Sequence, residues 1–159
     1  MRKDLIYTIT KEELTKEKLF DILDKHEEIK FVSIAAVDLI GHETDTKVPV
    51  KLFRKDIDLF LNGIAAQTDG SSVFLPKIAT LNNAKVDMKA DLDCNWFVEY
   101  NDSLLDPENG KPIGTIKIPC YLFHEGKPVD SRHILAEAEI DFKANVLKKK
   151  KNSQKLQDE

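Results

Sequence analysis

The chain has 159 residues, of which 42% are hydrophobic and 33% are charged, and its formal net charge is −4. This balance is typical of one folded globular domain, and it gives no electrostatic reason to expect nucleic acid as a partner. The longest uncharged apolar runs, such as Phe31–Val37, are too short to span a bilayer, and the N-terminus lacks a signal-peptide pattern. We therefore expect a cytoplasmic protein without membrane or nucleic-acid partners, whose two cysteines, Cys94 and Cys120, are free thiols.

The first part of the chain predicts two helices around a β-hairpin. Thr10 and Glu13 have the spacing of a capping box, and apolar residues then recur at helical intervals. A run of β-forming residues follows, and Gly41 provides a turn to the returning strand. The predicted elements are a helix over residues 11–28, strands over residues 30–38 and 46–50, and a helix over residues 51–62.

The second part of the chain predicts loops, then strands, then a long helix. Asp130 and Ser131 are good N-cap residues for that helix. Its apolar residues share one stripe, which consists of Ile134, Leu135, Ala138, Phe142 and Val146. Lysines over 148–151 suit its C-terminal end, where cations complement the helix dipole. Before the helix we expect loops over residues 67–72 and 73–83, and strands over residues 85–88, 95–100 and 114–123.

This order of elements predicts an α+β fold, in which a small mixed sheet packs against helices. The pattern alone does not name a function. The division that we expect is an N-terminal helical segment over residues 1–28, a sheet domain over residues 29–129, a helix over residues 130–151 and a disordered polar tail over residues 152–159.

Four segments of the sequence carry a family resemblance because they occur together and in one order. They are Lys30–Gly41 (KFVSIAAVDLIG), Thr68–Ser72 (TDGSS), Asp87–Met88 with Asp91–Asp93, and Gly126–Arg132 (GKPVDSR). In this order they resemble the N-terminal β-grasp domain of the glutamine synthetase (glutamate–ammonia ligase) family. The resemblance covers residues 29–147 and implies a β-grasp sheet followed by a linker helix.

The resemblance also implies a reaction and its cofactors. In the family, ATP phosphorylates the side chain of glutamate, and ammonia then displaces the phosphate. The reaction needs ATP and Mg²⁺ or Mn²⁺, which the family binds in a large C-terminal barrel domain. We expect this chain to be truncated before that barrel, to hold no cofactor and to be inactive alone. Its implied partners are glutamine synthetase subunits or the missing catalytic domain.

The resemblance assigns a role to the loop of Asp69, Gly70, Ser71 and Ser72. Asp69 would bind ammonium and help to remove its proton in the active site of a neighbouring subunit, with Ser72 in support. A carboxylate stabilises an ammonium ion by charge and hydrogen bonding, and it can then act as a base. Gly70 would permit a tight backbone turn. On local sequence alone, Asp69 would only cap a turn, because Asp-Gly is a favoured turn dipeptide.

Other charged residues predict structural roles. Glu137 and Glu139 are two positions apart in a helical stretch, so their side chains do not share a face and we expect them to be solvated. Asp91 and Asp93 suggest an acidic turn between strands. The histidines are scattered, with neither HxH nor HExxH spacing, so we expect surface or turn roles for all of them and no metal site. They are His26, His42, His124 and His133.

Two alternatives remain open for the function. The chain could be a free-standing β-grasp interaction module that acts on a full-length synthetase, and an exposed apolar patch would favour this hypothesis. It could instead belong to a γ-glutamyl-amine ligase, a relative that uses another amine. Thr68 keeps that alternative open, because the family usually has an aromatic residue or leucine at this position.

Overall fold

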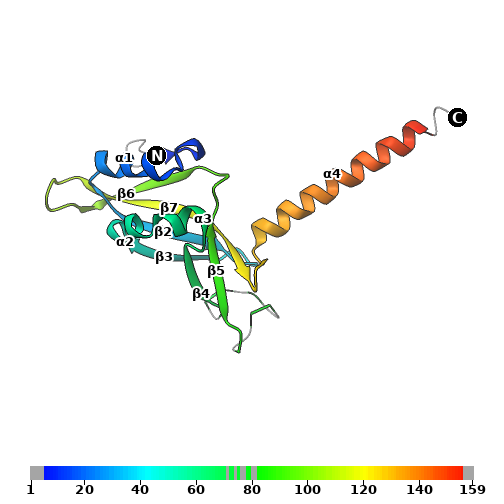
Figure 1. Cartoon of the computed structure of the whole chain (residues 1–159), viewed down its shortest axis with the longest axis horizontal. Helices are drawn as coiled ribbons and strands as arrows, with labels where there is room; N and C mark the ends of the chain where they lie inside the picture. Colours follow the sequence, from blue (N-terminus) through cyan, green and yellow to red (C-terminus); the bar gives the residue numbers. More distant parts are fainter. Residues whose placement is uncertain (1–5, 71, 74, 76–77, 80–81, 156–159) are drawn as a thin grey trace.

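The computed structural model describes residues 6–70, 72–73, 75, 78–79 and 82–155 (Figure 1). The helices are α1 (Lys16–Lys25), α2 (Val50–Lys55), α3 (Ile57–Asn62) and α4 (Ser131–Lys155), with a short 3-10 helix at Lys11–Glu13. The strands are β1 (Ile6–Ile9), β2 (Ile29–Val37), β3 (Glu43–Pro49), β4 (Ala66–Asp69), β5 (Lys85–Ala90), β6 (Trp96–Leu105), β7 (Pro112–His124) and β8 (Lys127–Pro128). None of the helices in the described part of the chain is long and apolar enough to cross a membrane.

The strands form a mixed sheet in which the long strand β7 is central. The main path runs β1-β6-β7-β2-β3, and β5 and β8 also pair with β7, while β4 pairs with β5. The β2–β7 pair is parallel, whereas β2–β3 and β6–β7 are antiparallel. A first hairpin with a later strand inserted parallel to its first strand is a β-grasp arrangement. The predicted α+β class is thereby confirmed.

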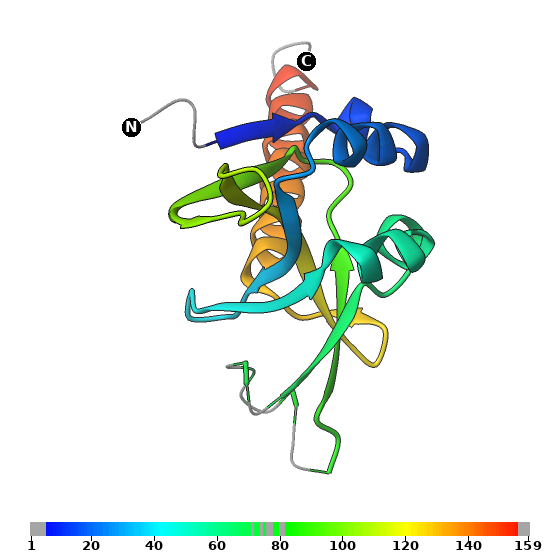
Figure 2. The same cartoon turned by 90° about the vertical axis from the view of Figure 1, so that its left-hand side faces the viewer.

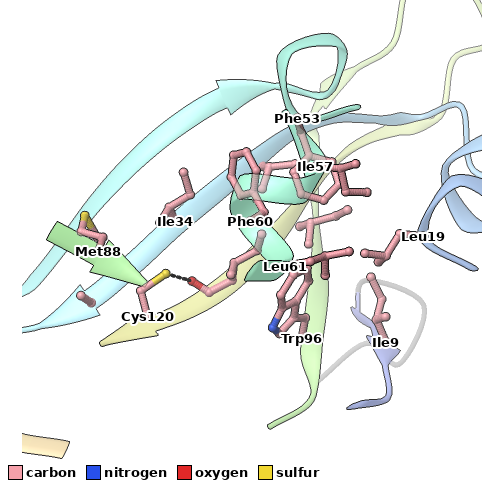
Figure 3. Packing of buried hydrophobic residues seen from close by; sticks show 14 of the residues in the cluster. Ile9, Leu19, Ile34, Phe53, Ile57, Phe60, Leu61, Met88, Trp96 and Cys120 are labelled. Carbon is pink, nitrogen blue, oxygen red and sulfur yellow. Dashed lines mark hydrogen bonds between the residues drawn. The ribbon is translucent and has the colours of Figure 1, made fainter. Parts of the chain in front are cut away.

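Helices α1, α2 and α3 cover one face of the sheet, as the two views show (Figures 1 and 2). Strand residues alternate between the two faces, so the inward residues of β2 and β7, such as Ile34 and Ile118, meet the apolar stripes of the helices. The core contains the fully buried side chains of Phe53 and Trp96 (Figure 3). The opposite face of the sheet is not covered by these helices, and Phe97 is partly exposed there.

Both predicted N-terminal helices differ from the structure in one respect. The Thr10–Glu13 capping box exists, but it caps the 3-10 helix, and α1 begins only after Thr15, whose side chain accepts a hydrogen bond from the backbone of Lys18. The helix predicted over residues 51–62 is divided into α2 and α3 at Asp56. Local capping thus interrupts an apolar periodicity that continues across the break.

Three further predictions need correction. The predicted loop over residues 67–72 begins as strand β4, because its backbone pairs with β5. Strand β1, which pairs with β6 at the edge of the sheet, was not predicted. Helix α4 continues to Lys155, past the start of the tail that we expected to be disordered, since neither glycine nor proline stops it. Residues 156–159 lie outside the described part of the chain.

The apolar stripe of α4 does not join the core of this chain. The helix leaves the body of the protein and extends away from it (Figure 1). The side chains of residues 134–145 are all exposed, including Leu135 at 71% and Phe142 at 69%. An apolar residue of α4 therefore contributes little to the core of this chain.

Candidate functional site

The predicted site loop lies at the end of a two-stranded hairpin. Strand β4 pairs with β5 in antiparallel register, so that Asp69 faces Lys85 across the pair. This hairpin extends from the body of the protein on a different side from α4 (Figure 1). Asp69 is the last residue of β4, and its side chain is exposed. The sequence-predicted carboxylate is thus at the surface, at one end of the hairpin.

Gly70 is required by a close approach of the backbone. Its N–H donates to the carbonyl oxygen of Ala84 at 2.5 Å. A Cβ atom at this position would lie 2.5 Å from the Cβ of Ala79 and 3.2 Å from the carbonyl oxygen of Ala84. Only glycine fits without a shift of the backbone, which agrees with the tight turn that we predicted. The close packing fixes where the preceding residue, Asp69, leaves the strand.

The residues after Gly70 close the turn and anchor it. The N–H of Ser72 donates to the carbonyl oxygen of Asp69 at 2.8 Å, and the side chain of Ser72 is exposed. Val73 and Leu75 then return to the core, with 5% and 3% of their surface exposed. Ser71, the other predicted loop residue, lies outside the described residues. The structure therefore brings Asp69 and Ser72 together through the backbone.

The first residue of β5 is also braced. The Nδ1 atom of His124 donates to the carbonyl oxygen of Lys85 at 2.9 Å. His124 is only 7% exposed, so it is not the surface residue that we predicted as one possibility, but it ends β7 directly before the turn at residues 125–126. The side chain of Asn83 donates to Glu125 at 2.6 Å. These contacts tie the hairpin to the end of β7 next to the loop.

The other end of β5 leads to a buried acidic residue. Asp91 follows β5 directly and is 2% exposed, and its carboxylate accepts hydrogen bonds from the guanidinium of Arg132 and from the N–H of Asp93. Its backbone carbonyl accepts the indole N–H of Trp96 at 2.9 Å. The predicted acidic turn is therefore half right: Asp93 is exposed, but Asp91 forms a buried ion pair with the first turn of α4.

The electrostatics of this pair favour the charged state of both groups. Burial opposes ionisation of Asp91, but hydrogen bonds from Arg132, the Asp93 backbone and the Tyr121 hydroxyl hold the pKa of this carboxyl below its ordinary value. Burial also opposes the charge of Arg132, yet the hydrogen bond and the charge of Asp91 raise the pKa of the guanidinium. The guanidinium lies 4.6 Å from the centre of the Tyr121 ring, a cation–π distance.

Asp130 holds the start of α4 from inside the protein. It is fully buried, and its carboxylate accepts the N–H of Leu122 on β7 and the N–H of His133 in the first turn, both at 2.9 Å. The N-cap role that we predicted for Asp130 is confirmed, and it has a second function as a link to the sheet. The ring of His133 packs edge-on against Tyr121, with centroids 4.6 Å apart.

A cavity of about 750 Å³ lies on the face of the sheet that α1–α3 leave uncovered. It is bounded by apolar residues such as Phe97 and Pro119, by charged residues such as Lys117, and by Arg132 at the root of α4. Cys94 and Cys120, which are both free thiols, also line it. Burial raises the pKa of Cys94 to about 11 and that of Cys120 to about 12, so neither thiol is a reactive nucleophile at neutral pH.

Metal ligands do not gather in the described part of the chain. Within it, no group of three or more His, Cys, Asp or Glu side chains converges in a way that could hold a metal ion. The donor set that a divalent cation and a nucleotide triphosphate would need is therefore not met by these residues.

Comparisons with known proteins found similarity at the level of structure. No protein-family model matches the sequence, and no curated protein sequence matches it. A cryo-electron microscopy structure of Plasmodium falciparum glutamine synthetase is similar over 70% of this chain, at 17% identity and a TM-score of 0.49. Two structures of GmaS, one in complex with ADP and one without ligand, are similar over 68% and 67% of the chain, at 19% identity and TM-scores of 0.45 and 0.44.

The matched region is a small part of each solved structure. It covers 18% of the Plasmodium falciparum chain and 21% of each GmaS chain. This chain thus spans about a fifth of the length of the solved structures to which it is similar.

Proposed function

We propose that this chain is the N-terminal β-grasp part of a glutamine synthetase, the ATP-dependent ligase that makes glutamine from glutamate and ammonia. In this proposal, residues 29–129 are the β-grasp domain and α4 leads toward a catalytic domain. The chain takes part in subunit assembly and supplies the Asp69–Ser72 loop to the ammonium site of a neighbouring subunit. The carrying observation is the exposed carboxylate of Asp69 at the end of a braced hairpin, within segments that resemble the family loop.

The geometry supports a defined division of roles within the loop. Asp69 would hold the ammonium ion by charge and hydrogen bonding, and would take up one proton as ammonia attacks. Gly70 would position the carboxylate, because its backbone is packed against Ala79 and Ala84. The hydroxyl of Ser72 is exposed beside the turn and would hydrogen-bond the loop or the ammonium ion.

The remaining parts of the site are assigned to a further domain. In this proposal that domain supplies the ligands of Mg²⁺ or Mn²⁺, because the described residues contain no group of three or more His, Cys, Asp or Glu side chains that could hold a metal ion. We place the complete enzyme in the cytoplasm, and we expect this chain alone to show no glutamate-dependent release of ADP. A clear rate of such release from the pure chain would contradict this part of the proposal.

The proposal is tested by complementation. The chain is mixed with a full-length glutamine synthetase whose own loop aspartate has been changed to asparagine, and ATP-dependent glutamine formation is measured. We expect the native chain to restore activity and Asp69→Asn not to restore it. Asp21→Asn is the matched control, because it removes an exposed carboxylate from α1, away from the loop.

The two outcomes separate clearly. If native chain and Asp21→Asn restore activity and Asp69→Asn does not, the loop carboxylate acts in trans. If none of the folded chains restores activity although sedimentation shows that they assemble with the synthetase, the proposed role of Asp69 is wrong.

One observation favours a second candidate function, a free-standing interaction module that acts on a full-length synthetase. Helix α4 exposes Ile134, Leu135 and Phe142, which share one stripe of the helix, at 52%, 71% and 69% of their surface. Such a patch is typical of a surface that another protein covers. Changing Leu135 and Phe142 to serine should abolish co-sedimentation with the synthetase if this patch is the contact, and unchanged co-sedimentation would exclude it.

We do not favour a different amine substrate in this proposal. Thr68, which kept that alternative open in the sequence, precedes Asp69 in β4, and consecutive residues of a strand point to opposite faces. Thr68 is half-buried, whereas Asp69 is exposed. The unusual residue therefore faces away from the carboxylate that would bind the amine.

A further inference from the structure

The root of α4 has few contacts to determine the direction of a long helix. The helix has 25 residues, which corresponds to a length of about 37 Å at 1.5 Å per residue. Of the helix residues whose burial is described, the first turn, residues 131–133, is partly covered by the body, and residues 134–145 are all exposed. A change of about 15° at the root would move the far end by about 10 Å. The contacts of the first turn therefore determine the direction in which α4 extends.

Two of those contacts join the first turn to different strands. Asp130 accepts the N–H of Leu122, so it fixes the start of the helix against β7. Arg132 forms the ion pair with Asp91, which fixes the second helical residue against the end of β5. One contact would allow α4 to pivot, whereas two contacts on different strands, together with the Tyr121 ring beneath the guanidinium, define a direction.

The strand that carries Asp91 also carries the partner of the site loop. In β5, Lys85 pairs with Asp69 at one end, and Ala90 pairs with Cys120 of β7 at the other. Asp91 follows immediately, and its N–H donates to the carbonyl oxygen of Pro119 at 2.8 Å. A single short strand thus connects the loop to the root of α4.

We propose that Asp91 and Arg132 are positioning residues that set the direction of α4 relative to the Asp69 loop. The ion pair is a clamp between the end of β5 and the first turn of the helix. This ion pair thereby places the domain that follows α4 at a fixed distance from the carboxylate of Asp69. The functional part of this inference rests on the proposed function, because it assumes that a catalytic domain follows α4.

The geometric part can be tested on this chain alone. One-bond N–H residual dipolar couplings report the orientation of α4 relative to the sheet, without labels that would disturb Cys94. In the native chain, we expect the couplings of residues 134–147 and those of the strands to fit one alignment tensor. In Asp91→Asn, which keeps the shape and loses the charge, we expect the α4 couplings to fall to about half or less while those of the sheet stay unchanged.

A control and a second variant make the outcome decisive. Glu139→Gln removes an exposed ion pair with Lys143 within α4 and should leave the orientation unchanged. If Asp91→Asn does not fold, Arg132→Lys replaces it, since lysine keeps the charge but loses the planar hydrogen bonding and the stacking on Tyr121. The proposal is overturned if folded variants keep the native couplings, if α4 already reorients freely in the native chain, or if both variants unfold, since the pair would then serve the whole fold.

These results are independent of the complementation assay. A clamp that behaves as expected beside a failed complementation would leave the geometric inference standing and remove the proposed function. If the variants keep the native orientation of α4 and complementation succeeds, the proposed function stands and the geometric inference is removed.

Discussion

The chain projects from its body in two places, and the two projections are held differently. The β4–β5 hairpin is braced along its length by strand pairing, by the close packing of Gly70, and by the buried residues Val73 and Leu75. Within the described residues, helix α4 is held to the body at its first turn, through Asp130, Arg132 and His133. The hairpin presents a carboxylate at the surface, whereas the helix presents apolar side chains.

This difference indicates which surface is complete in this chain. The position of the hairpin follows from its own contacts, so Asp69 is held in place before any partner arrives. The exposed apolar side chains of α4 have no counterpart in the body, and their burial requires another domain or subunit. The hairpin can therefore act as a preformed part of a site, and the helix as a connection or contact surface.

The largest expected effect compares a leucine from each projection. Leu75 is 3% exposed beneath the hairpin loop and Leu135 is 71% exposed on α4. Leu75→Ala should lower the free energy of unfolding by about 2–5 kcal/mol, because it leaves a cavity in the core. Leu135→Ala should change it by less than about 0.5 kcal/mol. Urea denaturation of both variants tests the comparison, and equal losses would contradict it.

A smaller loss of stability is expected when Gly70 in the hairpin loop is changed to alanine, with Gly63→Ala as the control. Gly70→Ala would place a methyl group 2.5 Å from the Cβ of Ala79, so we expect a loss of about 1–3 kcal/mol. Gly63→Ala meets its nearest atom at 3.4 Å, an ordinary contact, and should be tolerated. Denaturant midpoints give the stabilities of both variants. A harmless Gly70→Ala would show that the loop is not held by close packing.

The stability that Asp91 contributes at the first turn of α4 should depend on pH. The pKa of Asp91 is lower in the folded protein than in the unfolded chain, so the unfolded chain takes up the proton first as the pH falls. The contribution of Asp91 to stability is therefore complete above the ordinary aspartate pKa of about 4, and it is lost as the pH falls through the lower folded pKa.

A variant isolates that contribution. Asp91→Asn should cost about 1.5 kcal/mol near neutral pH, because a charge-assisted hydrogen bond is lost. The difference between the native chain and the variant should shrink as the pH falls below about 4. Denaturant titrations at several pH values measure it. A difference that stays constant over this range would show that ionisation of Asp91 does not stabilise the root of α4.

Local patterns in the sequence predict most of the elements, and they fail where contacts across the fold decide. The period of the apolar residues located α1 and α4, and a run of β-forming residues located β2. Neither pattern could show that β4 is a strand, since the pairing of that polar segment with β5 is a long-range contact. The apolar period of α4 also could not show that these residues stay exposed. Such a period identifies the residues that share a helix face, but not whether that face is buried.

The residues of the predicted loop came from the family resemblance, whereas the contacts that support the loop could not be predicted from the sequence. The resemblance located Asp69 and Gly70, and it placed Asp91 and Arg132 in two separate segments. The ion pair between those segments joins residues 41 positions apart, so no local spacing reveals it. An acidic residue directly after a strand and an arginine in the first turn of a helix were the available indications.

The central claim is that Asp69 supplies a working carboxylate to the ammonium site of another subunit. The most direct test is the ammonium dependence of glutamine formation in the complemented mixture, with native chain and with Asp69→Asn at equal occupancy. We expect the native mixture to saturate with ammonium and the Asp69→Asn mixture to be slower by about 10²-fold or more, as for the loss of a general base. Equal rates and equal ammonium dependence for the two chains would contradict the claim and leave Asp69 as a turn residue.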